Sequence, residues 1–290
     1  MSSKLGNKIS EGSCSEVFEW EGSHKVIKLA KENIDFETMN REFINNKMAW
    51  DHKLPVARPF ELLEINGRPG IVYERIYGKP LLERFLGHLM VDINQKVDLN
   101  GGDIPLIART LGEIHNNSNI NLPASHREDL KYLINSVQYL TKEEKENVIS
   151  ILDSLPTKQL LCHGDPNPDN FLIGDDGKAV VIDWMNASIG NPEADVAEFI
   201  VMIKYAILPP EIPSQVSEYF YSIREELIQI FMEEYTNLTG ITYDEIIPWL
   251  TPMAARKLYT ADALLEEEKK LLVEVIRKDL ETRELTNKSM

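Results

Sequence analysis

The sequence is poor in cysteine, has no long hydrophobic run and carries no excess of positive charge. Its 290 residues include two cysteines, Cys14 and Cys162, which are too few for the disulfide framework of a small secreted protein. The roughly 18–20 apolar residues of a membrane-spanning helix do not occur in one stretch, and charged residues interrupt the N-terminal segment where a signal peptide would need an apolar core. We therefore expect a soluble, cytoplasmic protein without a membrane partner.

Negative charge predominates instead. With 31 basic and 47 acidic residues, the net charge is −16 at pH 7. A surface of this sign repels a phosphate backbone, so we expect no nucleic-acid partner. The same charge favours cationic ligands, although it also serves solubility alone. The length of the chain lies near the size at which one hydrophobic core gives way to two.

The first third of the chain has the pattern of short strands around one helix. The segments with a β-type pattern are residues 9–20 (two strands around Gly12 and Ser13), 25–30, 60–65 and 70–74. Asn66-Gly67, between the last two, is a strong hairpin signal. Residues 35–50 place apolar side chains at helical spacing, with Glu42 near the middle.

The remainder of the chain has mainly helical periodicity. The expected helices are residues 81–90, 104–115, 127–140, 141–155 and most of the chain from 193 onwards, and a short β-type island covers 159–162, 171–173 and 179–182. We therefore expect an α+β protein with a small N-terminal antiparallel β lobe (residues 1–78) and a large helical C-terminal lobe (residues 79–290).

The segment from His163 to Trp184 carries the strongest chemical signal. Asp165 and Asn170 are separated by two prolines, so they lie on a loop, and the turn at residues 174–177 folds the chain back to bring Asp183 near Asn170. Carboxylate and amide oxygens that converge in this way can hold Mg²⁺ together with substrate phosphates. An isolated Asp–Asn pair would more simply be turn chemistry, so the ordered combination of motifs carries the prediction.

That combination resembles the aminoglycoside phosphotransferase and choline kinase family, relatives of protein kinases that share their two-lobed fold. The shared pattern is His-Gly-Asp, four residues, Asn, and then Ile-Asp-Trp. It extends upstream to Leu111-Gly-Glu-Ile-His115 and downstream to Gly190-Asn-Pro-Glu-Ala-Asp195-Val-Ala197. The resemblance implies a protein-kinase-like fold for this chain.

The resemblance also implies roles for the residues of this loop. Phosphoryl transfer depends mainly on positioning and charge stabilisation. Asp165 would accept the acceptor's proton or orient its hydroxyl, and Asn170 and Asp183 would coordinate Mg²⁺. His163 would hold the loop by hydrogen bonds rather than exchange protons. Asp195 would tie down the loop backbone, a structural role.

A nucleotide site is implied in the N-terminal lobe. Lys28 resembles the strand lysine that binds the α- and β-phosphates in kinases. Glu42 is the best helix partner for Lys28, and Glu37 is the alternative.

Two further segments complete the expected nucleotide site. Gly12 and Ser13 lie in a loop over the phosphates that has one glycine where protein kinases have three. Backbone groups of Glu74 and Ile76 would bond the adenine edge. We expect ATP as the nucleotide. Because backbone groups would read the base, the sequence does not distinguish ATP from GTP, and GTP stays open as the alternative.

The interval between Asp183 and Asp195 is too short for a regulated activation segment, which favours a small-molecule acceptor over a protein substrate. Asp244, Glu245 and Asp262, with Trp249 and Tyr259, offer ion pairs and cation–π contacts to an ammonium group; the alternative is an ordinary amphipathic helix with a solvated face. These five residues are the expected acceptor-binding set.

The sequence therefore predicts a Mg²⁺-dependent small-molecule kinase that phosphorylates a hydroxyl of a cationic, aminoglycoside-like acceptor. The alternatives are a choline, amino-alcohol or sugar kinase of the same family, a catalytically weak nucleotide-binding module, or an interaction protein with an inherited fold. We expect a monomer or a weak homodimer.

Overall fold

The computed structural model describes residues 5–91, 102–117, 120, 122 and 125–288. The chain forms two compact units. The first contains the residues up to Glu83 together with Pro168–Ala187, and the second contains Arg84–Asn167 and the residues from Ser188 onwards. The hairpin segment Pro168–Ala187 thus groups with the N-terminal strands. The domain boundary between residues 78 and 79 stays a prediction.

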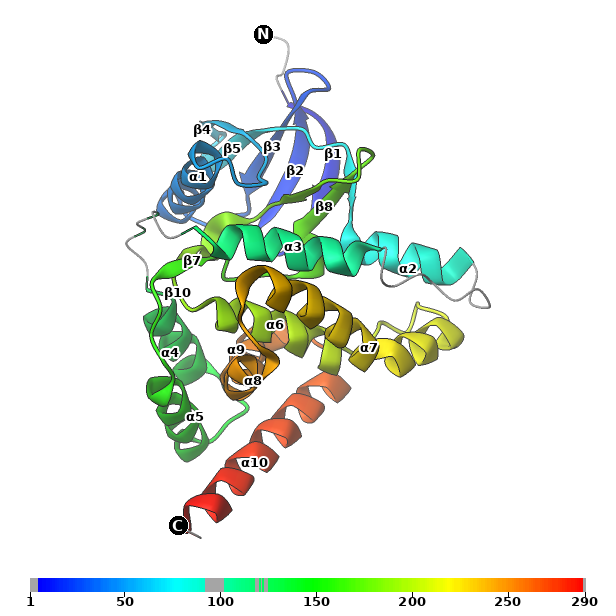
Figure 1. Ribbon diagram of the computed structural model, residues 1–290. Helices are drawn as coiled ribbons and strands as arrows, with labels where there is room; N and C mark the ends of the chain where they lie inside the picture. The colour runs from blue at the N-terminus through cyan, green and yellow to red at the C-terminus, as the bar shows by residue number, and fades with distance from the viewer. Residues whose placement is uncertain (1–4, 92–101, 118–119, 121, 123–124, 289–290) are drawn as a thin grey trace. The chain divides into compact units, whose positions relative to one another are not determined.

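The described residues of the first unit form a five-stranded antiparallel sheet in the order β1-β2-β3-β5-β4 (Figure 1). Its strands are β1 (Leu5–Glu11), β2 (Ser15–Trp20), β3 (Lys25–Ala30), β4 (Pro59–Ile65) and β5 (Arg68–Glu74). The turn between β4 and β5 has positive φ at both Asn66 (53°) and Gly67 (80°), as a two-residue hairpin turn requires. The predicted hairpins are confirmed.

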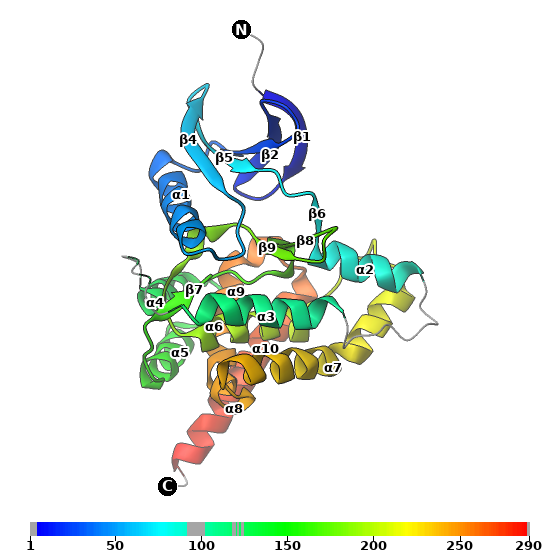
Figure 2. The ribbon, with the colours of Figure 1, turned by 45° about the horizontal axis from the view of Figure 1, so that its top comes forward.

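Helix α1 (Phe36–Asp51) begins at Asp35, whose carboxylate accepts a hydrogen bond of 2.8 Å from the Thr38 N–H. It packs beside β4 and β5 (Figure 2) and against the 3₁₀ turn η2 (Trp184–Asn186). Met39 of this helix is fully buried with Ile71 of the sheet. The inward face of the helix is therefore fixed, and Glu42 lies one turn after Met39 on that face.

A second, smaller sheet completes the first unit. It consists of β6 (Gly78–Pro80), β8 (Phe171–Gly174) and β9 (Ala179–Val181), and η1 (Pro168–Asn170) precedes β8. The β8–β9 turn contains Gly177 with φ +76°, which a glycine tolerates without strain. The Ile182 N–H donates a 2.9 Å hydrogen bond to the Asn170 carbonyl. The backbone therefore brings Asn170 beside the start of the Asp183 segment.

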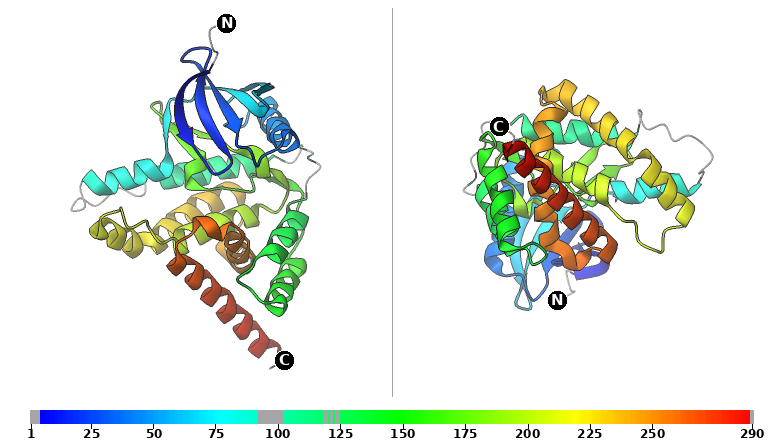
Figure 3. Two further views of the ribbon diagram at one scale, coloured as in Figure 1. Left: turned by 180° about the vertical axis from the view of Figure 1, so that it is seen from behind. Right: turned by 90° about the horizontal axis from the view of Figure 1, so that it is seen from below.

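The second unit is mainly helical. Its described elements are α2 (Leu81–Val91, which begins in the first unit), α3 (Asp103–His115), α4 (His126–Ser136), α5 (Lys142–Ser154), β7 (Leu160–Cys162), β10 (Ser188–Gly190), α6 (Pro192–Tyr205), α7 (Ser214–Thr239), α8 (Tyr243–Ile246), η3 (Ile247–Trp249), α9 (Leu250–Lys257), η4 (Leu258–Ala263) and α10 (Glu266–Lys288). Helix α6 is buried along most of its length and packs against α7 and α9. The red helix α10 lies next to α9, as both views of Figure 3 show.

The differences from the predicted elements have local causes. The helix expected to reach residue 140 ends at Ser136, because Val137 has an extended backbone (φ −64°, ψ 132°). Val137 and Leu140 are nevertheless buried, so their apolar pattern reflects core burial rather than a helix. The three-residue strands β6 and β10 were not predicted, since they are too short to show alternation. None of the helices in the described ranges is both long and apolar enough to cross a membrane.

Candidate active site

Lys28 lies in the middle of β3, between Val17 of β2 and Ile71 of β5. Its ammonium nitrogen is 2.7 and 2.9 Å from the two carboxylate oxygens of Glu42. It is also 3.0 Å from Oδ1 of Asp183. The predicted pairing of Lys28 with Glu42 is confirmed, and the alternative partner Glu37 is exposed at the start of α1.

The ion pair between Lys28 and Glu42 is largely buried, and its burial affects the pKa values of both residues. The Glu42 side chain is 1% exposed and also accepts a 3.1 Å hydrogen bond from the Tyr73 hydroxyl. Burial raises the pKa of Glu42, and the neighbouring ammonium opposes that effect. For Lys28, burial acts to lower the pKa, but the carboxylates of Glu42 and Asp183 outweigh it and raise the pKa above its usual value. Lys28 therefore stays positively charged at neutral pH.

Asp183 holds a strained backbone at the end of the β8–β9 hairpin. Its φ and ψ are 64° and 62°, the left-handed region that costs a residue with a Cβ roughly 1–3 kcal/mol. The conformation directs the chain from β9 into η2. The Asp183 side chain is 40% exposed even though Oδ1 contacts Lys28. The backbone hydrogen bond between Ile182 and Asn170 brings the two segments together, and the Asp183 carboxylate and the Asn170 amide carry oxygen ligands of the kind that could hold Mg²⁺.

The His-Gly-Asp loop of the second unit is anchored by Asp195 of α6. The Asp195 carboxylate accepts hydrogen bonds from the His163 N–H (2.6 Å) and the Gly164 N–H (3.0 Å). It also lies 3.1 Å from Nε2 of His115, whose Nδ1 is 2.7 Å from the Tyr235 hydroxyl. Burial acts to raise the pKa of Asp195, but hydrogen bonding and charge interaction with His115 lower it to about 2. The predicted anchoring role of Asp195 is confirmed.

The loop itself is fixed from within. His163 is fully buried, and its Nδ1 is 2.9 Å from the Asp165 carbonyl oxygen. Gly164 has φ +77°, a conformation that favours glycine. His163 thus contacts the loop backbone, in agreement with its expected holding role, and Asp165 follows with a half-buried side chain.

Sequence reasoning missed one residue at this loop. Arg256 of α9 donates a 2.8 Å hydrogen bond from Nη2 to the Gly164 carbonyl and forms an ion pair with Glu198 of α6. Its signal in the sequence is a pair of adjacent basic residues, Arg256 and Lys257, in a stretch that is otherwise apolar over residues 252–258. That signal alone does not reveal a partner 92 residues away in the chain.

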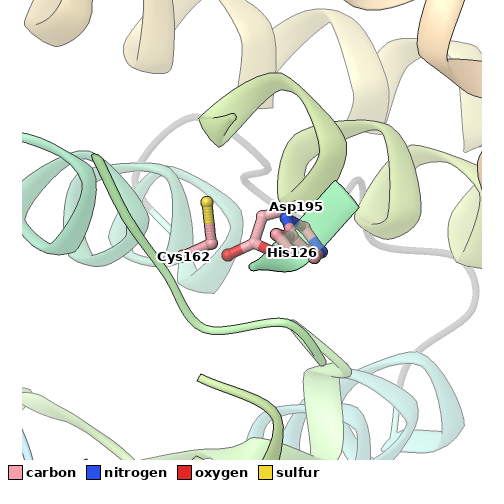
Figure 4. A group of neighbouring side chains, drawn as sticks. All are labelled: His126, Cys162 and Asp195. Carbon is pink, nitrogen blue, oxygen red and sulfur yellow. The ribbon is translucent and has the colours of Figure 1, made fainter. Parts of the chain in front are cut away.

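Asp195 also belongs to a buried cluster with His126 and Cys162 (Figure 4). One potential ligand atom of each lies within 4.8 Å of the others. Burial lowers the pKa of His126 and raises that of the Cys162 thiol, so both are neutral. These residue types also bind metals, but the Asp195 oxygens are already occupied by the loop N–H groups. Within this cluster, Asp195 is the residue whose hydrogen bonds hold the loop.

The residues expected to line the nucleotide base and phosphates lie at or just beyond the ends of strands of the first sheet. Gly12 and Ser13 form the β1–β2 turn, which a 2.9 Å hydrogen bond from the Gly12 N–H to the Ser15 carbonyl closes. Glu74 ends β5, and Ile76 packs against the core cluster beside Tyr73. Their contacts with a nucleotide stay a prediction.

The expected acceptor residues are distributed over α8, η3 and η4. Asp244 and Glu245 are exposed, but Glu245 caps α8 by accepting a 2.8 Å hydrogen bond from the Thr242 N–H. Tyr259 is 47% exposed. The side chain of Asp262 lies outside the described part of the structure.

Trp249 differs from the expectation. Its side chain is only 2% exposed, and the Arg127 guanidinium lies 5.5 Å from its ring. The indole is therefore part of the core of the second unit, and the ring that was expected to meet an ammonium ligand already has an internal cation. We leave Trp249 out of the acceptor-binding set.

A lysine paired with a helix glutamate in the first unit and an anchored His-Gly-Asp loop in the second are features of kinase-type enzymes. A sequence profile of the phosphotransferase enzyme family matches residues 9–225, and the chain belongs to this family. No curated protein sequence matches the chain. The family assignment agrees with the resemblance seen in the loop motifs.

Solved structures show the same fold. Choline kinase LicA from Streptococcus pneumoniae is 16% identical, with 97% of this chain and 95% of that chain covered and a TM-score of 0.61. A thermostable mutant of aminoglycoside phosphotransferase APH(4)-Ia, in a ternary complex with AMP-PNP and hygromycin B, is 15% identical, with 97% and 92% covered and a TM-score of 0.61. Aminoglycoside phosphotransferase APH(3'')-Id from Streptomyces rimosus is 14% identical, with 88% and 92% covered and a TM-score of 0.56. The protein has the α+β, protein-kinase-like fold that the sequence predicts.

Proposed function

We propose that this protein is a Mg²⁺-dependent kinase that transfers the γ-phosphate of ATP to a hydroxyl group of a small, cationic acceptor. The observation that carries the proposal is the position of Lys28 between Glu42 and Asp183. In kinases a lysine held by a helix carboxylate binds nucleotide phosphates, and a neighbouring aspartate holds the metal.

Each residue of the candidate site has a separate role in the proposed phosphoryl transfer. Lys28 binds the α- and β-phosphates, and Asn170 and Asp183 hold Mg²⁺. When bound, this ion neutralises the charge on the phosphate oxygens. Asp165 orients the acceptor hydroxyl and takes its proton, while His163 and Asp195 keep the loop in place.

The nucleotide is supported by the same set of residues and by one similar structure. The backbone of Gly12 and Ser13 contacts the phosphates, and backbone groups of Glu74 and Ile76 contact the base. The ternary complex of APH(4)-Ia contains AMP-PNP, an ATP analogue, in a protein of the same fold. Because the base is read by backbone groups, GTP is a possible second donor.

The acceptor class rests on charge. A net charge of −16 attracts cations, and Asp244, Glu245 and Asp262 with Tyr259 supply carboxylates and an aromatic face in the second unit. An aminoglycoside-like amine is the first candidate. Choline or another amino alcohol is the second, since the fold of choline kinase LicA covers 97% of this chain. A sugar kinase and a catalytically weak nucleotide-binding module are the remaining alternatives.

We expect the protein to be cytoplasmic and to be a monomer or a weak homodimer.

An acceptor screen tests the proposal. ADP release would be followed with ATP or GTP, with and without Mg²⁺, across aminoglycosides, choline, homoserine and neutral sugars. We expect Mg²⁺-dependent ADP release that an amine-bearing alcohol stimulates, and phosphorylated acceptor by mass spectrometry. Asp165→Asn should abolish the stimulation, while Asp175→Asn, an exposed change in the β8–β9 turn, should not. Nucleotide binding without transfer to any acceptor would instead support the weak nucleotide-binding module.

A further inference from the structure

The guanidinium group of Arg256 is buried against the loop that carries Asp165. Its side chain is 14% exposed, and that of its partner Glu198 is 3% exposed. Nη1 forms the ion pair with Glu198, which leaves Nη2 to donate the 2.8 Å hydrogen bond to the Gly164 carbonyl oxygen. The planar fork of an arginine suits this double contact, since its donors point in fixed directions.

The position of the bond matters because Gly164 is the most flexible kind of residue. Its φ of +77° is one of many conformations that a glycine can adopt. The Gly164 N–H is held by Asp195 at 3.0 Å, and the Gly164 carbonyl is held by Arg256 at 2.8 Å. The peptide planes on both sides of Gly164 are therefore fixed, and the second of them leads directly into Asp165.

Helix α6 supplies both of these restraints. Asp195 and Glu198 are three residues apart, so they lie on the same face of the helix. Asp195 binds the loop directly, whereas Glu198 binds it through Arg256. The charge of Arg256 also interacts favourably with the carboxylates of Asp165 and Asp195, which opposes the cost of its burial.

We propose that Arg256 is a positioning residue, which clamps the peptide between Gly164 and Asp165 so that the Asp165 carboxylate is presented to the acceptor in one orientation. The inference rests on the proposed function in one respect, the role of Asp165 as the residue that meets the acceptor hydroxyl. Arg256 contacts the loop backbone rather than the reacting atoms.

Two variants separate the clamp from the stability of the core. Arg256→Lys keeps a cation for Glu198 but has a single nitrogen in place of the Nη1 and Nη2 atoms that contact Glu198 and Gly164 separately. The double variant Glu198→Gln/Arg256→Met removes both charges together, which avoids leaving a buried charge without a partner. Arg127→Lys is the matched control, because the Arg127 guanidinium also donates to backbone carbonyls, at Leu155 and Pro156.

Hydrogen exchange measures the clamp without any catalysis. In both Arg256 variants we expect amide exchange in peptides covering residues 163–166 to accelerate by about tenfold or more, as expected when one charged hydrogen bond is lost. Arg127→Lys should leave exchange in these peptides unchanged. Unchanged exchange in the Arg256 variants, or equal acceleration in the control, would overturn the inference.

Kinetics measure the consequence. ADP release is measured with the acceptor found in the screen, or with water if none is found. Relative to wild type, kcat should fall by about 10- to 100-fold in the Arg256 variants, because a small misplacement of a catalytic group costs about this much. The Kd for ATP should change by less than about threefold, and Arg127→Lys should keep its kcat. Full kcat in both Arg256 variants would refute the clamp. If wild-type protein releases no ADP at all, the proposed function fails, while the exchange experiment still decides the clamp.

Discussion

Replacement of Lys28 by Met is the perturbation whose size the structure defines best. The change removes the cation that lies 2.7 and 2.9 Å from the Glu42 oxygens. Glu42 is then left 1% exposed, with the Tyr73 hydroxyl as its described donor. A buried charge that loses its partner costs about 3–5 kcal/mol. The lost contact with Asp183 adds little, because that carboxylate is 40% exposed.

The double variant Lys28→Met/Glu42→Gln tests the cause of this loss. It removes both charges, and the glutamine carbonyl can still accept the hydrogen bond from Tyr73. We expect it to be within about 1–2 kcal/mol of wild type, and therefore more stable than Lys28→Met alone. The coupling energy of the cycle should be about 2 kcal/mol or more, which exceeds the usual value for an exposed ion pair.

The assay is urea-induced unfolding of wild type, the single variants Lys28→Met and Glu42→Gln, and the double variant at several pH values. In Lys28→Met, burial without a cation raises the folded-state pKa of Glu42 above its unfolded value of 4.5. As the pH falls, the Glu42 carboxylate of the folded variant takes up a proton before that of the unfolded chain does. The loss in free energy of unfolding relative to wild type is therefore largest near pH 7 and shrinks as the pH falls toward 4.5. A loss below about 1 kcal/mol at pH 7, or additive losses in the double variant, would refute the buried-pair argument.

Three further predictions concern the candidate site and its support. Asp183→Ala should abolish the Mg²⁺-dependent part of nucleotide affinity, measured by titration with and without the metal; an unchanged metal dependence would show that Asp183 is structural. Asp165→Asn should reduce transfer by roughly 10²–10⁴-fold with nucleotide Kd unchanged, and wild-type turnover would exclude its assigned role. Burial lowers the pKa of His126 below 6.5, so the folded state binds fewer protons and unfolding free energy should fall as pH drops below 6.5. His126→Leu should flatten this dependence in urea unfolding, whereas replacing the exposed His24 by Gln should not.

The sequence could predict part of the Lys28–Glu42 pair from local pattern and part from resemblance. The β-branched run at residues 25–30 indicates a strand, and the helical period around Glu42 indicates which face of the helix packs on the sheet, whereas Lys28 is singled out by its resemblance to the strand lysine of kinases. Asp195 was predictable as a loop anchor because its motif matches a family pattern. The contact of Arg256 with Gly164 was not, since it joins segments 92 residues apart and depends on how α9 packs against α6.

The burial of Trp249 could not be predicted from the sequence. An aromatic residue among acidic ones has the same sequence pattern whether its ring faces solvent or the core. The structure places Arg127 over the indole, and α4 packs against α9, so the cation–π contact is internal. No periodicity within residues 249–262 reports a neighbour that comes from α4. Tertiary packing, and not local composition, decides which aromatic residue remains available to a ligand.

Packing constrains the residues proposed for phosphoryl transfer more tightly than those proposed for the acceptor. Phosphoryl transfer requires fixed distances among a few charged groups, and these are built from buried pairs such as Lys28–Glu42 and from the Asp195 hydrogen bonds to the loop. Such groups form recognisable sequence motifs, because replacing one of them leaves a buried charge without its partner. Asp244 and Tyr259, which we propose for the acceptor, are exposed and have no such constraint. An exposed carboxylate such as Asp244 would attract a cationic acceptor through a screened interaction that falls off over roughly 8–10 Å at physiological salt, and such an attraction would favour a charge class of acceptor without selecting one molecule.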